Sequence, residues 1–99
     1  MSKLGDARRK FTQMVPLLLT KMIQSGYGPM IGRDGLKHMV GSLHFEGLAV
    51  DIDLTLNGVY LSKTSAHEQF GIYWESLGGS WGGRFSDGNH YSLAYQGKK

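Results

Sequence analysis

Polar and apolar residues alternate most clearly over residues 43–56, which predicts a β-strand with one face on a core. The apolar face of this strand is formed by Val50, Ile52, Leu54 and Leu56. Asp51 and Asp53 fall on the opposite face. The dipeptide Asn57-Gly58 follows directly, which is typical of a tight hairpin, so residues 59–61 should return as the paired strand.

Two further segments have the three-and-four spacing of an amphipathic helix. The first should begin at Asp6 as N-cap and stop at Gly26, with Pro16 predicting a kink or a break into two shorter helices. Its apolar face consists of Phe11, Met14, Val15, Leu18 and Met22. The second should open with the capping-box pattern Ser65–Glu68 and end at Gly78-Gly79.

The remaining segments predict turns and short strands. Residues 26–35 are rich in glycine and should form a turn or an irregular strand, and residues 81–85 should form a loop. A last short strand is expected over His90–Tyr95. The order of elements predicts a single α+β domain over residues 1–99, with a small antiparallel sheet and the helices packed on one side of it.

Composition narrows the chemistry that this domain can carry. The chain has 99 residues and no cysteine, so a metal site would use nitrogen and oxygen ligands. The net charge of +3 is not gathered into a basic stripe with interleaved aromatic residues, which disfavours nucleic acid as a partner. We recognise no export signal and no segment long enough to span a bilayer, so we expect synthesis in a cytoplasm and no stable membrane insertion.

Four polar residues in two segments form a possible metal site. His44, Asp51 and His90 make a ligand set suited to catalytic zinc, which leaves a fourth position for water. Asp87, three residues before His90, could take the proton of that water. On spacing alone other interpretations stay open, because a single histidine is more often a surface or capping residue and the aspartates could lie on a solvated strand face.

Two sequence blocks resemble the VanY-type zinc peptidases, a family that includes D-Ala-D-Ala carboxypeptidases and the L-alanyl-D-glutamate endopeptidases of phage endolysins. Residues 42–51, SLHFEGLAVD, resemble the family motif S-x-H-x-x-G-x-A-x-D. Residues 81–91, WGGRFSDGNHY, look like its W-G-G-x-(W/F)…D-x-x-H-(F/Y) block. The resemblance runs from about Arg8 to Tyr95, and the segment from Gly26 to Gly41 is shorter than is usual in the family.

The resemblance implies a role for each matching residue. His44, Asp51 and His90 would hold Zn²⁺, and Asp87 would be the catalytic acid and base. Substrate contacts are expected from Ser42, Arg33 and Trp81, with Arg33 in the place of the family's arginine. The implied function is a phage-type endolysin that cuts a peptidoglycan stem peptide, most simply at the L-Ala–D-Glu bond, during lysis of the host cell.

Alternatives from other classes remain open. One is a D,D- or L,D-carboxypeptidase that trims stem peptides, and another is a non-catalytic, metal-stabilised wall-binding module. We expect a monomer made in the host cytoplasm that acts on the cell wall in the periplasm after delivery by another factor. The other two histidines, His38 in a loop and His67 in the first turn of a helix, are expected to be exposed and without a catalytic role.

Overall fold

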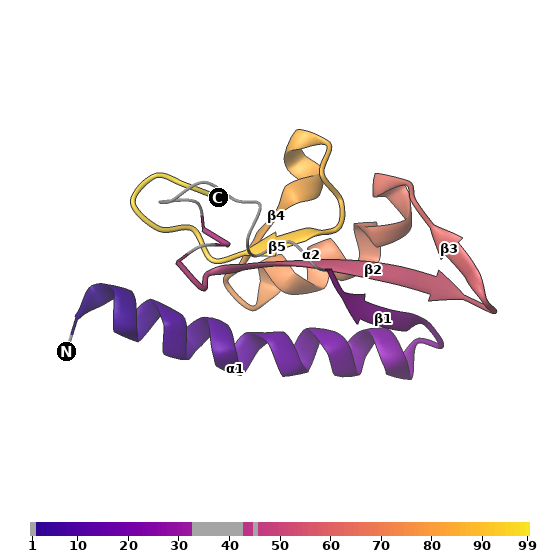
Figure 1. The fold of residues 1–99 in the computed structure, drawn as a ribbon, viewed down its shortest axis with the longest axis horizontal. Helices are drawn as coiled ribbons and strands as arrows, with labels where there is room; N and C mark the ends of the chain where they lie inside the picture. The colour runs from indigo at the N-terminus through magenta and orange to yellow at the C-terminus, as the bar shows by residue number, and fades with distance from the viewer. Residues whose placement is uncertain (1, 33–42, 45) are drawn as a thin grey trace.

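The longest strand, β2 (Ala49–Leu56), pairs with three others in the five-stranded antiparallel sheet of the computed structural model (Figure 1). The structure describes residues 2–32, 43–44 and 46–99. The sheet order is β1-β2-β5-β4, and β3 also pairs with β2. The other strands are β1 (Gly28–Ile31), β3 (Val59–Leu61), β4 (Ser80–Trp81) and β5 (His90–Ser92).

The alternation predicted for β2 and the hairpin after it are confirmed. Val50, Ile52 and Leu54 are buried. The dipeptide Asn57-Gly58 has φ values of 52° and 79°, as a type I′ turn requires, and Leu56 pairs with Val59 across it. The strand begins later than predicted, at Ala49 instead of Leu43, because the chain before it folds into a hydrogen-bonded turn.

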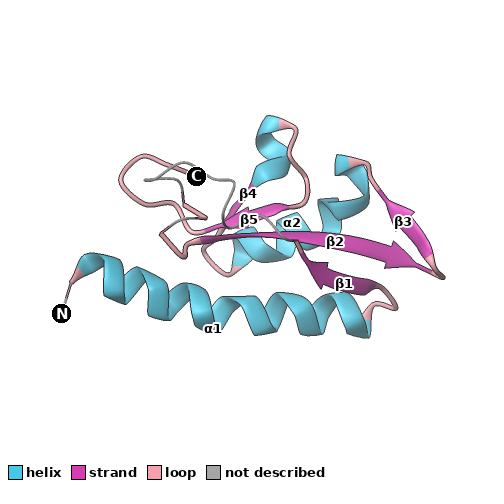
Figure 2. Ribbon diagram, viewed as in Figure 1, coloured by secondary structure: helices cyan, strands magenta, loops and turns pink. Residues whose placement is uncertain are grey.

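Helix α1 (Lys3–Gln24) begins before the predicted residue and continues through its proline. The N-cap is Ser2 and not Asp6, since the Ser2 hydroxyl accepts a hydrogen bond from the Gly5 amide at 3.0 Å. The expected break at Pro16 is wrong, and a single helix spans the segment (Figure 2). Pro16 lies on the exposed side, where water can hydrogen-bond the carbonyl that the proline leaves without an amide donor.

The second helical segment consists of a short 3₁₀ turn, η2 (Thr64–His67), followed by α2 (Glu68–Ser76). The predicted capping box is wrong, because neither element has a side-chain capping hydrogen bond. The predicted stop is confirmed. Gly78 has a φ of 100°, and the Gly79 amide donates back to the carbonyl of Trp74.

The segment after α2 is more regular than the sequence predicts. The expected loop over residues 81–85 forms the end of β4 and a 3₁₀ turn, η3 (Gly82–Phe85). The last strand ends at Ser92 and not at Tyr95, although the Leu93 amide still donates to the carbonyl of Leu48 at 2.9 Å.

One face of the sheet packs against both helices and forms the core, as predicted for an α+β domain. The core residues are Phe11, Met14, Leu18, Met22, Leu43, Leu48, Val50, Ile52, Leu54, Phe70, Trp74, Trp81, Tyr91 and Leu93. They come from both helices, from β2, β4 and β5, and from the residues that flank β2 and β5. The opposite face of β2 is therefore left for polar chemistry.

Among the described residues, no helix is both long and apolar enough to cross a membrane.

Candidate metal centre

His44 is placed by a tight turn that precedes β2. The Gly47 amide donates to the carbonyl of His44 at 3.1 Å, and the Leu48 amide donates to the carbonyl of Leu43 at 2.7 Å. Gly47 has a φ of 74°, a conformation that residues with a Cβ rarely adopt. Leu43 and Leu48 are both buried, so the turn is anchored in the core while His44 points away from it.

Strand pairing places the other two ligands of the predicted set next to each other. Asp51 of β2 is the direct cross-strand partner of His90 of β5. Directly opposed residues of an antiparallel pair project to the same face of the sheet. Val50 and Tyr91, one residue away on each strand, are also partners and face the core. The register therefore brings together two residues that are far apart in the sequence.

Three potential ligand atoms converge at this point. His44 Nε2 lies 3.1 Å from His90 Nδ1 and 3.3 Å from Asp51 Oδ1, and His90 Nδ1 lies 3.5 Å from the same oxygen. A tetrahedral ion with bonds of ~2.0–2.1 Å separates its ligand atoms by ~3.3 Å. The three distances fit that geometry, and the two histidine side chains are only 8% exposed. These residues could together hold a metal ion.

The second ring nitrogen of His90 is also engaged. Its Nε2 lies 3.2 Å from the backbone oxygen of Lys99, to which an Nε2–H group donates. With the proton on Nε2, the neutral ring presents the lone pair of Nδ1 to Asp51 and His44. The ring of Phe85 lies 5.7 Å from that of His90. Such outer contacts orient a metal-binding histidine and select its tautomer.

Asp87, the predicted acid and base, lies at the start of the turn that leads into His90. The His90 amide donates to the Asp87 carbonyl at 3.1 Å, and the Asp87 amide donates to the Gly82 carbonyl at 2.9 Å. A Cβ added to Gly82 would lie 2.2 Å from the Asp87 carbonyl oxygen, so this close approach requires glycine. Asp87 itself is exposed, which leaves its carboxylate accessible from solvent.

Trp81 and Arg84, two further side chains of the second motif, hydrogen-bond to this turn and to α2. Trp81 is buried in the core, and its indole N–H donates to the Gly88 carbonyl at 2.8 Å. Arg84 donates two hydrogen bonds to Glu75 of α2, at 2.7 and 2.9 Å. These bonds hold the pKa of the Glu75 carboxyl below its usual range. The predicted substrate contact by Trp81 stays a prediction, because the structure places this ring beneath the turn.

His67 is buried, which corrects the expectation that it is exposed. Its Nδ1 lies 2.8 Å from the hydroxyl of Tyr91. Burial lowers the pKa of His67, and the nearby carboxylate of Asp53 partly opposes that shift. Burial also raises the pKa of Tyr91. The sequence carried a signal for this position, since His67 lies three residues before the buried Phe70, on the same helical face.

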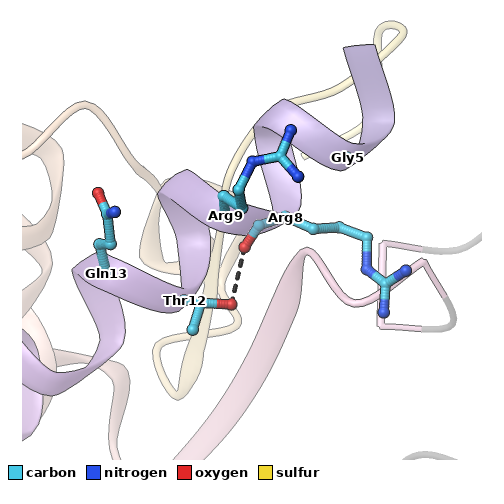
Figure 3. Close-up of a pocket in the computed structure, with 5 residues that line it drawn as sticks. All are labelled: Gly5, Arg8, Arg9, Thr12 and Gln13. Carbon is cyan, nitrogen blue, oxygen red and sulfur yellow. Dashed lines mark hydrogen bonds between the residues drawn. The ribbon is translucent and has the colours of Figure 1, made fainter. Parts of the chain in front are cut away.

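Three predicted positions lie outside the described residues: Arg33, His38 and Ser42. Their predicted roles are therefore left as they stand in the sequence. A pocket of about 410 Å³ lies on α1, and none of the converging residues lines it (Figure 3). Its lining consists of Gly5, Arg8, Arg9, Thr12 and Gln13, with the Thr12 hydroxyl donating to the Arg8 carbonyl at 2.8 Å.

One comparison with known proteins covers the segment that contains this site. A family model described as D-alanyl-D-alanine carboxypeptidase matches residues 37–93, which is more than half of the chain. His44, Asp51, Asp87 and His90 all lie within the matched segment. No curated protein matches the chain, and no solved structure matches it.

Proposed function

The chain belongs to the D-alanyl-D-alanine carboxypeptidase family of M15 peptidases, and on this premise we propose that it is a zinc-dependent endopeptidase of the endolysin type. The family indicates a metallopeptidase that acts on peptidoglycan. We assign the cleaved bond to the amide between L-Ala and D-Glu of the stem peptide. The observation that carries the proposal is the convergence of His44 Nε2, Asp51 Oδ1 and His90 Nδ1 within the matched segment.

In this proposal the three converging residues hold the metal and Asp87 moves the proton. When bound, zinc supplies Lewis-acid polarisation of the scissile carbonyl and a water of lowered pKa. The Asp87 carboxylate accepts a proton from the attacking water as the new C–O bond forms. It then donates that proton to the leaving nitrogen as the C–N bond breaks. The turn from Asp87 to His90 links the base to a ligand through one backbone hydrogen bond.

The wider setting is proposed on the same basis. We place the protein in the host cytoplasm on synthesis and at the cell wall after delivery by another factor. A monomer is sufficient, because all four residues of the site belong to one chain. Ser42 and Arg33 are proposed to contact the stem peptide, as the resemblance of the first motif implies.

A second candidate function is favoured by the description of the matching family. A D-alanyl-D-alanine carboxypeptidase would use the same four residues and release the terminal D-Ala of the stem peptide. The two candidates differ in the product and share the bond type. A non-catalytic wall-binding module would retain the metal and release no product.

The deciding experiment is digestion of purified peptidoglycan, with the products identified by mass spectrometry. Wild-type protein with zinc should produce new L-Ala and D-Glu ends, and chelation should abolish them. Asp87→Asn should bind zinc normally and lose roughly 100- to 10,000-fold in rate, since it removes only the general base. Asp53→Asn, a matched change on the same sheet face, should stay active.

Each other outcome assigns a different function. Release of D-Ala by the wild type would identify the carboxypeptidase. No product from zinc-loaded, folded protein would exclude both peptidases and leave the binding module. An Asp87→Asn variant as active as the wild type would show that another group is the base.

A further inference from the structure

After β5 the chain turns back on itself, outside the segment that the family model matches (Figure 1). The Tyr95 amide donates to the Lys98 carbonyl and the Lys98 amide donates to the Tyr95 carbonyl, both at 3.0 Å. Between them, Gln96 and Gly97 have φ values of 49° and 79°, as a type I′ turn requires. These four residues therefore form a tight turn, which we call the 95–98 hairpin.

The 95–98 hairpin lies beside the turn that carries His44. The chain enters it still paired with that turn, because the Leu93 amide donates to the Leu48 carbonyl at 2.9 Å. Tyr95 is partly buried and packs against the core. A pocket of about 250 Å³ at this junction is lined by Leu4, Leu43, Glu46, Tyr95, Gln96 and Lys98. The hairpin is thus anchored to the core and adjoins the first histidine of the site.

The hairpin returns the chain to the second histidine. Lys99 directly follows it, and the backbone oxygen of Lys99 lies 3.2 Å from Nε2 of the buried His90. A neutral imidazole carries one N–H group, and a backbone oxygen can only accept a hydrogen bond. This contact is therefore a hydrogen bond only when the ring proton is on Nε2. Since the acceptor belongs to the backbone, its position depends on the hairpin and not on the side chain of residue 99.

Acceptors on opposite sides of the His90 ring compete for that proton. On the other side, Nδ1 lies 3.5 Å from the carboxylate oxygen Oδ1 of Asp51. A carboxylate is a strong acceptor, so in the metal-free protein it favours the tautomer with the proton on Nδ1. That tautomer has no lone pair on Nδ1 for a metal ion. The backbone oxygen of Lys99 opposes it by stabilising the proton on Nε2.

Resting on the proposed function for the assignment of His90 as a metal ligand, we infer that the 95–98 hairpin is a positioning element for this ring. It presents the backbone oxygen of Lys99 to Nε2 and so directs the Nδ1 lone pair toward His44 and Asp51 before a metal binds. A ligand set in its binding form beforehand binds more tightly, because less rearrangement accompanies binding. Metal affinity therefore depends on residues that lie beyond both sequence motifs.

The test breaks the turn with Gly97→Val, since a β-branched residue strongly disfavours the positive φ of this position. Zinc affinity, measured by competition with a chelator, should fall about tenfold. Nitrogen-15 NMR of the metal-free protein should show the His90 proton on Nε2 in the wild type and shared between both nitrogens in the variant.

Gly58→Val is the matched control. Gly58 has the same φ of 79° in the other type I′ turn, and an added Cβ meets no atom within 4 Å at either glycine. This variant should keep the zinc affinity and the His90 tautomer of the wild type. Gln96→Asn, which suits a type I′ turn, and Lys99→Ala, which keeps the backbone oxygen, should do the same.

The outcomes separate this inference from the proposed function. If Gly97→Val retains both the affinity and the tautomer, or if Gly58→Val loses as much, the hairpin does not position His90. If the wild type binds zinc and releases no product from peptidoglycan, the peptidase fails while the affinity difference still supports the hairpin. If the wild type binds no zinc, the proposed function fails, and the tautomer in metal-free protein still tests the hairpin. Circular dichroism of each variant excludes unfolding as the cause of a loss.

Discussion

The two faces of β2 perform different tasks with residues that alternate along one strand. Ile52 and Leu54 are fully buried against the helices, whereas Asp51 and Asp53 between and beside them face away from the core. Burial of one such aliphatic side chain contributes ~1.5–3 kcal/mol to folding. The aspartates make no comparable apolar contribution, and Asp51 converges with two histidines. Stability and chemistry can therefore be perturbed separately by neighbouring substitutions.

The largest effect is expected on the polar face, from Asp51→Asn. This change removes the anionic member of the converging set and should weaken metal binding by at least about 100-fold, with a matching loss of peptidase activity. Metal content after dialysis and isothermal titration with zinc measure it. Asp53→Asn, two residues along the same face, should bind zinc like the wild type. Equal losses in both variants would mean that the charge of the whole face, and not a ligand, is what matters.

On the apolar face, Ile52→Ala should lower the free energy of unfolding by ~2–4 kcal/mol, because it leaves a cavity in the core. Urea denaturation of metal-free protein measures the loss. Thr55→Ala removes only a long hydrogen bond to the Gly28 carbonyl and should cost less than ~1 kcal/mol. Zinc affinity of the folded Ile52→Ala protein should stay within a few-fold of the wild type. A large drop would couple the two faces.

Gly82→Ala tests the turn before β5, where the buried core meets the converging polar residues. The new Cβ would lie 2.2 Å from the Asp87 carbonyl oxygen and 2.7 Å from the Cβ of His90, so the turn must shift. We expect a loss of ~1–3 kcal/mol in stability together with weaker zinc binding. Gly5→Ala in α1 is the control and should be neutral or stabilising by up to ~1 kcal/mol. Normal zinc binding by Gly82→Ala would show that His90 does not depend on this packing.

The smallest effect concerns the pH dependence of stability through His67. Burial lowers its pKa in the folded protein, so below the unfolded value of ~6.5 the unfolded chain binds more protons. Stability is therefore lost as the pH falls from about 7 toward the folded pKa, by at most ~1.4 kcal/mol per pH unit. Metal-free His67→Gln should lose less stability than the wild type between pH 7.5 and 5.5. Identical pH profiles for the two proteins would contradict a buried, neutral His67.

Much of the fold could be predicted because its signals are local. The alternation in residues 50–54 predicts a strand from its period of two residues alone. Asn57-Gly58 predicts a tight turn because the backbone conformation it favours matches the twist of the flanking strands. The errors arose where the surroundings of a residue in the folded protein decide. Pro16 does not break α1, because its side of the helix is exposed to water. His67 is buried, because Tyr91 from a distant strand provides its hydrogen-bond partner.

The sequence by itself determined the residue types and order of the two motifs, and hence the family and the four candidate residues of the site. Those properties follow from the order of residues along the chain and do not require knowledge of which strands pair. Only the tertiary structure decided that Asp51 lies opposite His90 and that the turn before β2 brings His44 Nε2 within 3.3 Å of the same carboxylate. Register and turn geometry depend on contacts between segments far apart in the chain.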